Sequence, residues 1–426
     1  MAEERKAPKL RFPSFTDPWE QRKFSKVFDG LQNNTLSRVE LNYESGSVKN
    51  VHYGDVLIKF GDYIDASETE LPYISDDTKV DKFKNSFLQD GDIIIADTAE
   101  DDTVGKCTEI QGSEGLKLLS GLHTIPCRPK KKYGPKFLGY YINSPAYHNQ
   151  LKPLMQGIKV TSISKTALQD TDMMIPATIE EQSKIGEYLS NLDSLITLHQ
   201  RTCDQVNTLK KAMLQKMFPK EGETVPEIRF PKFTDPWEQR KLGKIGSTYT
   251  GLSGKTKEDF GHGEGKFITY MNVFLNPVAD LSRTESVEID KSQNEVQYGD
   301  VFFTTSSETP EEVGMSSVWL ENSVNTYLNS FCFGYRPTED IDPYYLAYML
   351  RSDSIRSKIV YLAQGISRYN ISKNKVMEID IPLPDKEEQK QIGKYFKDLD
   401  NLITLHQRKR DELKELKKGL LQQMFV

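Results

Sequence analysis

In two long stretches of the chain, an apolar residue or a histidine recurs every seven positions. The first stretch places Leu192, His199, Val206 and Met213 seven apart, and the second does the same with Leu399, His406, Leu413 and Leu420. Further apolar positions stand between them, at Leu195 or Ile196, Leu209 and Met217, and at Leu402 or Ile403, Leu416 and Met424. This spacing predicts two amphipathic helices, each with a coiled-coil seam. Each helix would run for about 38 residues, or about 57 Å.

The two seams are equivalent, so mutual pairing as an antiparallel coiled coil is the simplest arrangement. Another subunit or a second copy of the chain could also fill each seam. In an antiparallel pair, His199 and His406 would approach each other near the crossing point. The alternative is that each imidazole points to solvent or to a partner.

Matching signals stand at the start of each predicted helix. Thr178 and Asp385 precede Glu181 and Glu388 by three residues, which is the spacing of a capping box. In a capping box the first side chain accepts from an early backbone N–H, and the glutamate reaches back to the backbone N–H of the cap.

The rest of the chain shows strand and turn patterns. Residues 24–150 and 242–365 mix short apolar runs with Gly, Asn, Asp and Ser turns, and the segments 136–143 and 343–351 read as equivalent amphipathic helices. In each half a turn and a buried strand are expected at 90–95 and at 298–303. We therefore expect two α/β globular domains with curved sheets, separated by the two long helices.

An internal repeat sets the domain order. Residues 11–23 return at 229–241 with 12 of 13 identities, and residues 180–218 return at 387–425 with 23 of 39. The stretches between them have diverged, which leaves a shared scaffold with two unlike surfaces. We favour selection for two different targets over neutral drift after duplication. The predicted division is a first domain over 1–175, a helix over 176–218, a second domain over 219–380 and a helix over 381–426, with a pseudo-twofold relation.

Composition narrows the class of protein. The first residues are charged and carry no signal-peptide pattern, and no run of about 18 apolar residues exists, so we expect a cytoplasmic protein without a membrane span. Four widely spaced cysteines form no disulfide framework or Cys-x-x-Cys site. The net charge of −6 is unusual for a protein that grips DNA alone. A partner would then supply part of the grip.

The order of these blocks resembles a known family. Two variable domains alternate with two near-identical helices, each domain opens with Trp-Glu-Gln-Arg-Lys, and each closes with Gly, Ile-Ser-Lys, Ile-Pro and Glu-Glu-Gln-x-x-Ile-Gly. This resembles the specificity (S) subunit of Type I restriction-modification systems over essentially the whole chain. The resemblance implies that each domain reads one half of an interrupted double-stranded DNA site, and that the helices set the gap.

The same resemblance implies the partners. Two methyltransferase (M) subunits would methylate adenine at N6 with S-adenosylmethionine, and two translocase-nuclease (R) subunits would use ATP and magnesium. The chain itself would hold no cofactor and no metal and would be no enzyme. Apparent motifs agree with this expectation. Asp17-Pro18-Trp19 lacks the second proline of an amino-methyltransferase motif, and Gly254-Lys255-Thr256 lacks the first glycine of a P-loop.

Candidate DNA contacts are basic and hydroxyl side chains. The residues Arg128, Lys130, Lys131 and Lys132 form the densest basic tract, and Lys159 with Lys165 matches the region of Arg368, Tyr369 and Lys373. Thr304, Thr305 and Ser306 end a predicted strand with hydroxyl groups. The rival hypothesis is a coiled-coil scaffold that presents two protein-binding modules and never touches DNA.

Overall fold

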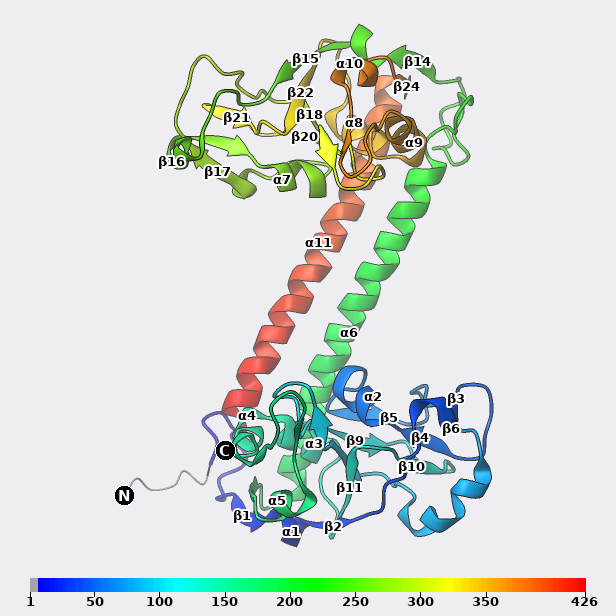
Figure 1. Ribbon diagram of the computed structural model, residues 1–426, viewed down its shortest axis with the longest axis vertical. Coiled ribbons are helices and arrows are strands. Elements are labelled where there is room, and N and C mark those ends of the chain that lie inside the picture. The colour runs from blue at the N-terminus through cyan, green and yellow to red at the C-terminus, as the bar shows by residue number, and fades with distance from the viewer. Residues whose placement is uncertain (1–6) are drawn as a thin grey trace. The chain divides into compact units, whose positions relative to one another are not determined.

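A computed structural model describes residues 7–426, which form two compact units (Figure 1). Unit 1 contains the first 199 residues and returns at Arg408–Val426, and unit 2 contains Gln200–Gln407. The long helices α6 (Ile179–Lys216) and α11 (Lys386–Gln423) each contribute one part to each unit. The two 38-residue helices predicted from the heptad pattern are thus present.

Unit 1 is built on a five-stranded mixed sheet and a four-stranded sheet. The first has the order β2 (Phe28–Gly30), β11 (Thr124–Pro129), β7 (Ile93–Ala96), β9 (Cys107–Gln111), β5 (Tyr63–Asp65), and only β5 and β9 run parallel. The second has the order β10 (Leu118–Ser120), β4 (Lys49–Val51), β6 (Tyr73–Ile74), β3 (Leu41–Asn42). Two-stranded pairs join β1 (Glu20–Lys23) to β13 (Asp172–Ile175) and β8 (Thr98–Ala99) to β12 (Thr161–Ser162).

Unit 2 repeats this plan with a smaller sheet. Its main sheet has the order β15 (Gly246–Thr250), β22 (Cys332–Pro337), β18 (Val301–Thr304), β20 (Ser316–Val318), all antiparallel. A second sheet has the order β17 (Thr284–Val287), β16 (Phe260–Ile268), β21 (Thr326–Leu328). Two-stranded pairs again join β14 (Glu238–Lys241) to β24 (Asp380–Leu383) and β19 (Ser306–Ser307) to β23 (Tyr369–Asn370).

Both units contain several short α-helices. They are α1 (Phe24–Val27), α2 (Tyr53–Ile58), α3 (Phe137–Asn143), α4 (Pro145–His148) and α5 (Lys165–Gln169) in unit 1, and α7 (Tyr270–Leu275), α8 (Pro343–Met349), α9 (Asp353–Tyr361) and α10 (Lys373–Val376) in unit 2. The expected helices at 136–143 and 343–351 correspond to α3 and α8. Both are buried against the cores of their units.

The main sheet of unit 1 has one strand more, at its edge, than the main sheet of unit 2. The fifth strand β5 of unit 1 is reduced in unit 2 to a single bridge between Val278 and Val318. Arg351 secures this edge, because its buried guanidinium donates to the carbonyl oxygens of Ser316, Val273, Phe274 and Asn276 at 2.7–3.0 Å. One buried cation therefore binds the backbone where unit 1 has a strand.

The repeated opening segments are attached to the starts of the long helices. Arg11 forms two hydrogen bonds to the carboxylate of Glu181, at 2.6 and 2.8 Å, and the indole N–H of Trp19 donates to the same carboxylate at 3.2 Å. Arg229 and Trp237 bind Glu388 in the same way. Both glutamates are buried.

This contact corrects half of the capping-box prediction. Thr178 and Asp385 do accept hydrogen bonds from the backbone N–H groups of Glu181 and Glu388. The two glutamate side chains bind the arginine and tryptophan instead of reaching back to the cap. The repeated opening segment and the start of the long helix thus form one structural unit, which explains why both are conserved between the two halves of the chain.

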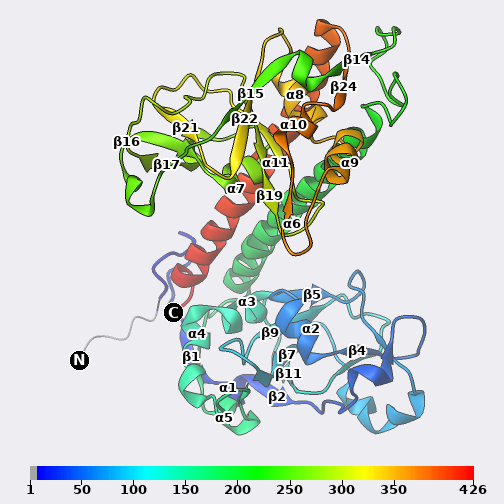
Figure 2. The same ribbon diagram turned by 45° about the horizontal axis from the view of Figure 1, so that its top comes forward.

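The two long helices run antiparallel in each unit (Figures 1 and 2). In unit 1, Lys417 of α11 donates to Asp193 of α6 at 2.7 Å, and Leu420 shares a core cluster with Leu192. In unit 2, Lys210 of α6 donates to Asp400 of α11 at 2.5 Å. Asp400 is the repeat of Asp193 and Lys417 is the repeat of Lys210, so the same pair occurs twice with the helices exchanged.

Each unit also holds the end of the helix that arrives from the other half of the sequence. Phe425 packs against Trp19 and Phe137 in unit 1, with ring centroids 6.4 and 6.1 Å apart. Phe218 packs against Trp237 and Tyr345 in unit 2. A helix start and a helix end are therefore part of each core.

At two positions of the predicted seam, the next residue along the chain faces the opposite helix instead of the expected leucine. Leu192, Val206, Leu399 and Leu420 are buried as expected, but Leu209 and Leu416 are 42% and 47% exposed. Lys210 and Lys417 face the opposite helix in their place. The approach of His199 to His406 would cross the division between the two units and stays a prediction.

Candidate DNA interface

The basic tract at 128–132 lies where β11 ends and the chain turns toward α3. Arg128 is committed to the fold, because it makes two hydrogen bonds to Asp92, at 2.9 and 2.7 Å, and donates to the carbonyl of Phe87 at 2.7 Å. The hydrogen bonds to Asp92 raise the pKa of Arg128. Arg336 and Asp300 repeat this pair in unit 2. Arg128 is therefore held in place by the fold, and its contact with a DNA phosphate stays a prediction.

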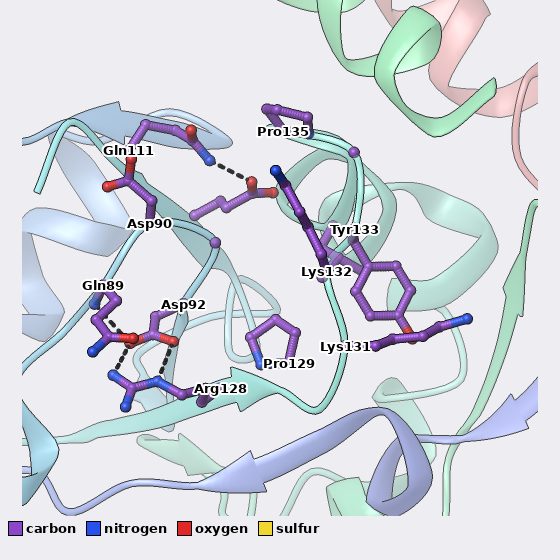
Figure 3. A pocket seen from close by; sticks show the side chains of 14 residues that line it. Gln89, Asp90, Asp92, Gln111, Arg128, Pro129, Lys131, Lys132, Tyr133 and Pro135 are labelled. Atoms are coloured by element: carbon purple, nitrogen blue, oxygen red, sulfur yellow. Dashed lines mark hydrogen bonds and ion pairs between the residues drawn. The ribbon is translucent and has the colours of Figure 1, made fainter. Parts of the chain in front are cut away.

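The three lysines of the tract are exposed. Lys130 donates to the carbonyl of Ser25 at 3.0 Å, and the Nζ of Lys131 lies 5.3 Å from the ring centroid of Tyr133. Lys131 and Lys132 border a hollow in the surface of unit 1. The hollow has a volume of about 430 Å³, with Lys131 and Lys132 on one side and the paired Arg128 and Asp92 on the other (Figure 3).

The matching hollow of unit 2 lacks the two lysines. It has a volume of about 330 Å³ and is bordered by Glu339 and Asp340 at the places of Lys131 and Lys132. Arg240 and Lys386 pair with these two carboxylates. The lysine tract thus occurs in unit 1 and has no equivalent in unit 2. It cannot be a phosphate-binding site common to the two units.

Beside the unit 1 hollow lies a buried carboxylate that the sequence analysis missed. Glu109 accepts hydrogen bonds from the backbone N–H groups of Lys136 and Gly139, at 2.6 and 3.0 Å, and from Gln111 at 2.7 Å. Burial raises the pKa of Glu109 to about 7, against the lowering effect of these donors. The carboxylate caps the start of α3, so its role is structural.

The hydroxyl cluster at 304–306 is more buried than expected. The Thr304 hydroxyl is fully buried and accepts from the N–H of Met315, and Ser306 is 6% exposed. These two side chains are corrected from DNA contacts to parts of the sheet. Thr305 remains a candidate, because it is half-exposed and its hydroxyl donates to the carbonyl of Phe331 at 2.9 Å.

The remaining candidates belong to two matching hairpins. In unit 1 the backbones of Gln156 and Ser162 exchange two hydrogen bonds, at 2.9 and 2.8 Å, and in unit 2 Gln364 and Asn370 do the same at 2.9 Å. Lys159 and Arg368 lie at the exposed turns, and Tyr369 is half-exposed in β23. Lys165 and Lys373 are the exposed first residues of α5 and α10, just after the hairpins.

Next to the hairpins, a constant backbone carries different side chains. The N–H of Asp97 donates to the carbonyl of His123 in unit 1, and the N–H of Thr305 donates to the carbonyl of Phe331 in unit 2. The following hairpin strand is tied to the same residue in both units, by Ile163 to Asp97 and by Ile371 to Thr305. An acid and an imidazole, 3.4 Å apart, thus stand where the other unit has a hydroxyl and an exposed phenyl ring.

Sequence reasoning missed Asp97, His123 and Phe331 because no motif marks them. One signal was available: the chain aligns without a gap from β7 to β11 and from β18 to β22, so these positions could have been paired by number. The described residues contain no group of three or more potential metal ligands, and among them no helix is long and apolar enough to cross a membrane.

Comparisons with known proteins match this architecture. A family model described as the Type I restriction modification DNA specificity domain matches residues 17–208 and again 234–415. A protein of Methanocaldococcus jannaschii, provisionally named the type I restriction enzyme MjaX specificity subunit, is 25% identical over 431 residues, or 97% of this chain and 94% of that protein. The MjaVIII specificity subunit of the same organism is 24% identical over 304 residues, or 64% of this chain and 65% of that protein.

Solved structures share the fold at low identity. The S subunit of a type I restriction-modification system from M. genitalium covers 99% of both chains with a TM-score of 0.54 and 14% identity. A chain from a study of assembly and conformational transition in the type I system covers 95% of this chain and 96% of that one, with a TM-score of 0.52 and 17% identity. The two-domain repeat predicted from the sequence is confirmed, and the chain belongs to the family of type I restriction-modification specificity subunits, which recognise DNA and do not catalyse.

Proposed function

We propose that each unit reads one half of an interrupted double-stranded DNA site, and that the base-reading side chains include Asp97 and His123 in unit 1 and Thr305 and Phe331 in unit 2. The single observation that carries this is the identical backbone bond between the two positions in each unit, under side chains of different chemistry. Carboxylate, imidazole, hydroxyl and phenyl groups present different donors, acceptors and apolar surface to a base edge.

An exchange of these side chains tests the proposal. Asp97→Thr with His123→Phe should change or abolish the first half of the methylated motif and leave the second half intact. The matched control is the reverse exchange, Thr305→Asp with Phe331→His, which should affect only the second half. Methylation profiling of a host that expresses the chain with its methyltransferase partner measures both. An unchanged motif in both variants would refute this assignment.

The exposed basic residues fit contacts to phosphates. Lys130, Lys131, Lys132, Lys159, Lys165, Arg368 and Lys373 all face solvent, and Tyr369 is half-exposed. Phosphate contacts position a protein without reading sequence, and each neutralised phosphate steepens the salt dependence of binding by about one unit. Lys131→Gln with Lys132→Gln should therefore weaken binding to all sequences alike and lower the salt slope. A change of motif without a change of slope would contradict this role.

The long helices offer a surface for protein partners. Leu195 and Leu416 are exposed in unit 1, and their repeats Leu402 and Leu209 are exposed in unit 2. Large leucines retained in both copies on the outer faces of a helix pair fit partner helices better than solvent. They support two equivalent docking places, one for each of two methyltransferase (M) subunits. Two restriction (R) subunits would complete the assembly for DNA cleavage.

In this assembly the cofactors stay with the partners, S-adenosylmethionine with M and ATP and magnesium with R. The docking proposal is tested by Leu195→Lys with Leu416→Lys, which should remove one M subunit from the complex. The pair Leu209→Lys with Leu402→Lys should remove one as well, and all four changes should remove both. Mass measurement of the purified complex gives the stoichiometry. Retention of two M subunits by the fourfold variant would exclude this surface.

A further inference from the structure

Each hairpin ends in an isoleucine that projects into solvent. Ile158 is 101% exposed and Ile366 is 94% exposed, more than any other large apolar side chain in the described part of the chain. Both follow a glycine with positive φ, Gly157 and Gly365. The two isoleucines occupy the same place in the two units, two residues after the hydrogen-bonded Gln156 and Gln364 at the base of the hairpin.

The tips are held on fixed supports. A Cβ at Gly157 would collide with the carbonyl oxygen of Val160, and a Cβ at Gly365 would collide with that of Arg368, so only glycine permits these turns. Below the tips, β12 pairs with β8 and β23 pairs with β19. The Thr161 hydroxyl adds hydrogen bonds to the carbonyls of Ala99 and Asp101. Each isoleucine is therefore presented by a pinned turn.

Retention in both copies limits what the isoleucines do. If the two units read different half-sites, as we propose, the side chains that read bases differ between the units, as Asp97 and Thr305 do. A feature that is the same in both units serves a step that is the same at both half-sites. If the proposed function holds, the shared step is methylation of an adenine, which must leave the base stack to reach a catalytic pocket.

We propose that Ile158 and Ile366 are wedges, each of which inserts into the base stack of its own half-site and fills the space left by the extruded adenine. This rests on the proposed function and adds a mechanical step to it. Isoleucine suits the task, since apolar side chains are the usual wedges between base steps, where they replace lost stacking contacts. Lys159 and Arg368 stand at the same turns and can contact the flanking phosphates.

Exposed acidic side chains lie around the hairpins. They favour insertion of a single side chain into the DNA over a large basic surface that binds many phosphates. Glu100, Asp101 and Asp102 are exposed beside the unit 1 hairpin, and Glu308 and Glu311 lie near the hairpin of unit 2. Such a surface does not attract phosphates along its whole width. At the hairpin itself, phosphate contact is thus limited to the few basic residues there, and the tip offers an apolar side chain to the bases.

The experiment uses the full chain in complex with its methyltransferase partner, on a duplex that carries the motif found by methylation profiling. 2-Aminopurine replaces the target adenine of one half-site at a time, so that its fluorescence rises when this base leaves the stack. Ile158→Ala should lower this rise at the first half-site only, and Ile366→Ala at the second only. On a separate duplex with adenine in both half-sites, since 2-aminopurine lacks the N6 amino group, each variant should slow methylation about tenfold at the same half-site. Ile158→Leu should retain most of both signals.

Ile58→Ala is the matched control, because Ile58 is an isoleucine of the same unit, 89% exposed, outside the hairpin. It should behave as the unmodified chain. The proposal is overturned if the alanine variants lower methylation at both half-sites equally, or leave both signals unchanged. Loss of the methyltransferase subunit from the Ile158→Ala complex would also overturn it, in favour of a protein contact. Failure of the unmodified complex to methylate a two-part motif would instead refute the proposed function.

Discussion

An ionisable side chain of opposite charge holds backbone in place in each of the two units. Glu109 satisfies the first N–H groups of α3 with a carboxylate, whereas Arg351 satisfies four carbonyl oxygens at a sheet edge. Burial raises the pKa of Glu109 to about 7 and lowers that of Arg351 to about 9. Both residues hold backbone in place, and both make their unit sensitive to a change of a single side chain.

Glu109 gives unit 1 a defined pH dependence. Its pKa lies above the ordinary value of 4.5, so between these values the folded state binds more protons than the unfolded state. Stability should therefore fall as pH rises from about 4.5 to about 7 and level off above that range. Glu109→Gln should flatten this part of the curve, measured by urea unfolding across pH 4.5–8. A variant curve parallel to that of the unmodified chain would show that another group is responsible.

Arg351 has the larger structural role. Arg351→Met removes a cation that binds four carbonyls and leaves them without that donor in a buried place, so we expect a loss of about 3 kcal/mol in the free energy of unfolding. Amide hydrogen exchange should also speed up in α7, whose carbonyls it binds. The exposed Lys375→Met is the control. Unchanged exchange in α7 would contradict this role.

At the scale of elements, the helices illustrate what a sequence pattern can predict. Leucine and methionine at seven-residue spacing predicted both helices and their buried face, because helix periodicity depends on local order alone. The pattern could not show that Lys210 and Lys417 replace Leu209 and Leu416 in the seam. Those lysines are placed there by partners distant in sequence: Asp400 with Tyr348 for one, and Asp193 with Tyr140 for the other.

The two seam lysines differ in the number of carboxylates that they bind. Lys417 pairs with Asp193 and also with Asp62 at 2.8 Å, while Lys210 pairs with Asp400 alone among the described residues. Burial lowers the pKa of Lys417, but attraction by Asp62 and Asp193 outweighs it and the pKa is raised. Lys417→Met should therefore cost more, about 3–5 kcal/mol, because it leaves two half-buried carboxylates without a cation.

Lys210→Met should cost less than Lys417→Met in the same urea unfolding measurement. If the two substitutions lower the free energy of unfolding equally, the ion pair between Lys417 and Asp62 contributes nothing to stability. The sequence offered no route to this asymmetry. Asp62 lies beside β5, the strand that unit 2 lacks, and such an edge strand cannot be told from a loop by its three residues.

At the scale of the whole molecule, the repeat was the strongest signal in the sequence. Identity between 11–23 and 229–241 and between the two helices fixed the order of blocks before any fold was known. The reading surface was hidden for the opposite reason, since residues that differ between copies leave no internal match. The ungapped alignment of β7 to β11 with β18 to β22 pairs Asp97 with Thr305, and the shared backbone bonds show that the two positions are equivalent in the fold.

The helices give a prediction about spacing. Insertion of seven residues after Arg201 and after its repeat Arg408 keeps the heptad phase and lengthens each helix by about 10 Å, or about three base pairs of DNA. The half-site sequences should stay the same while the gap in the methylated motif grows. Methylation profiling reads the gap directly. A gap of the original length with full activity would exclude the helices as the spacer.

Exchange of one entire reading domain tests the central claim most directly. Residues 242–379 lie between the paired strands β14 and β24 and can be replaced by the matching segment of a relative with a different motif, with both strands and both helices kept. Methylation profiling of a host with this chimera and the methyltransferase partner should show a new second half-site, the original first half-site and the original gap. A motif altered in both halves, or unaltered in both, would contradict independent reading by the two units.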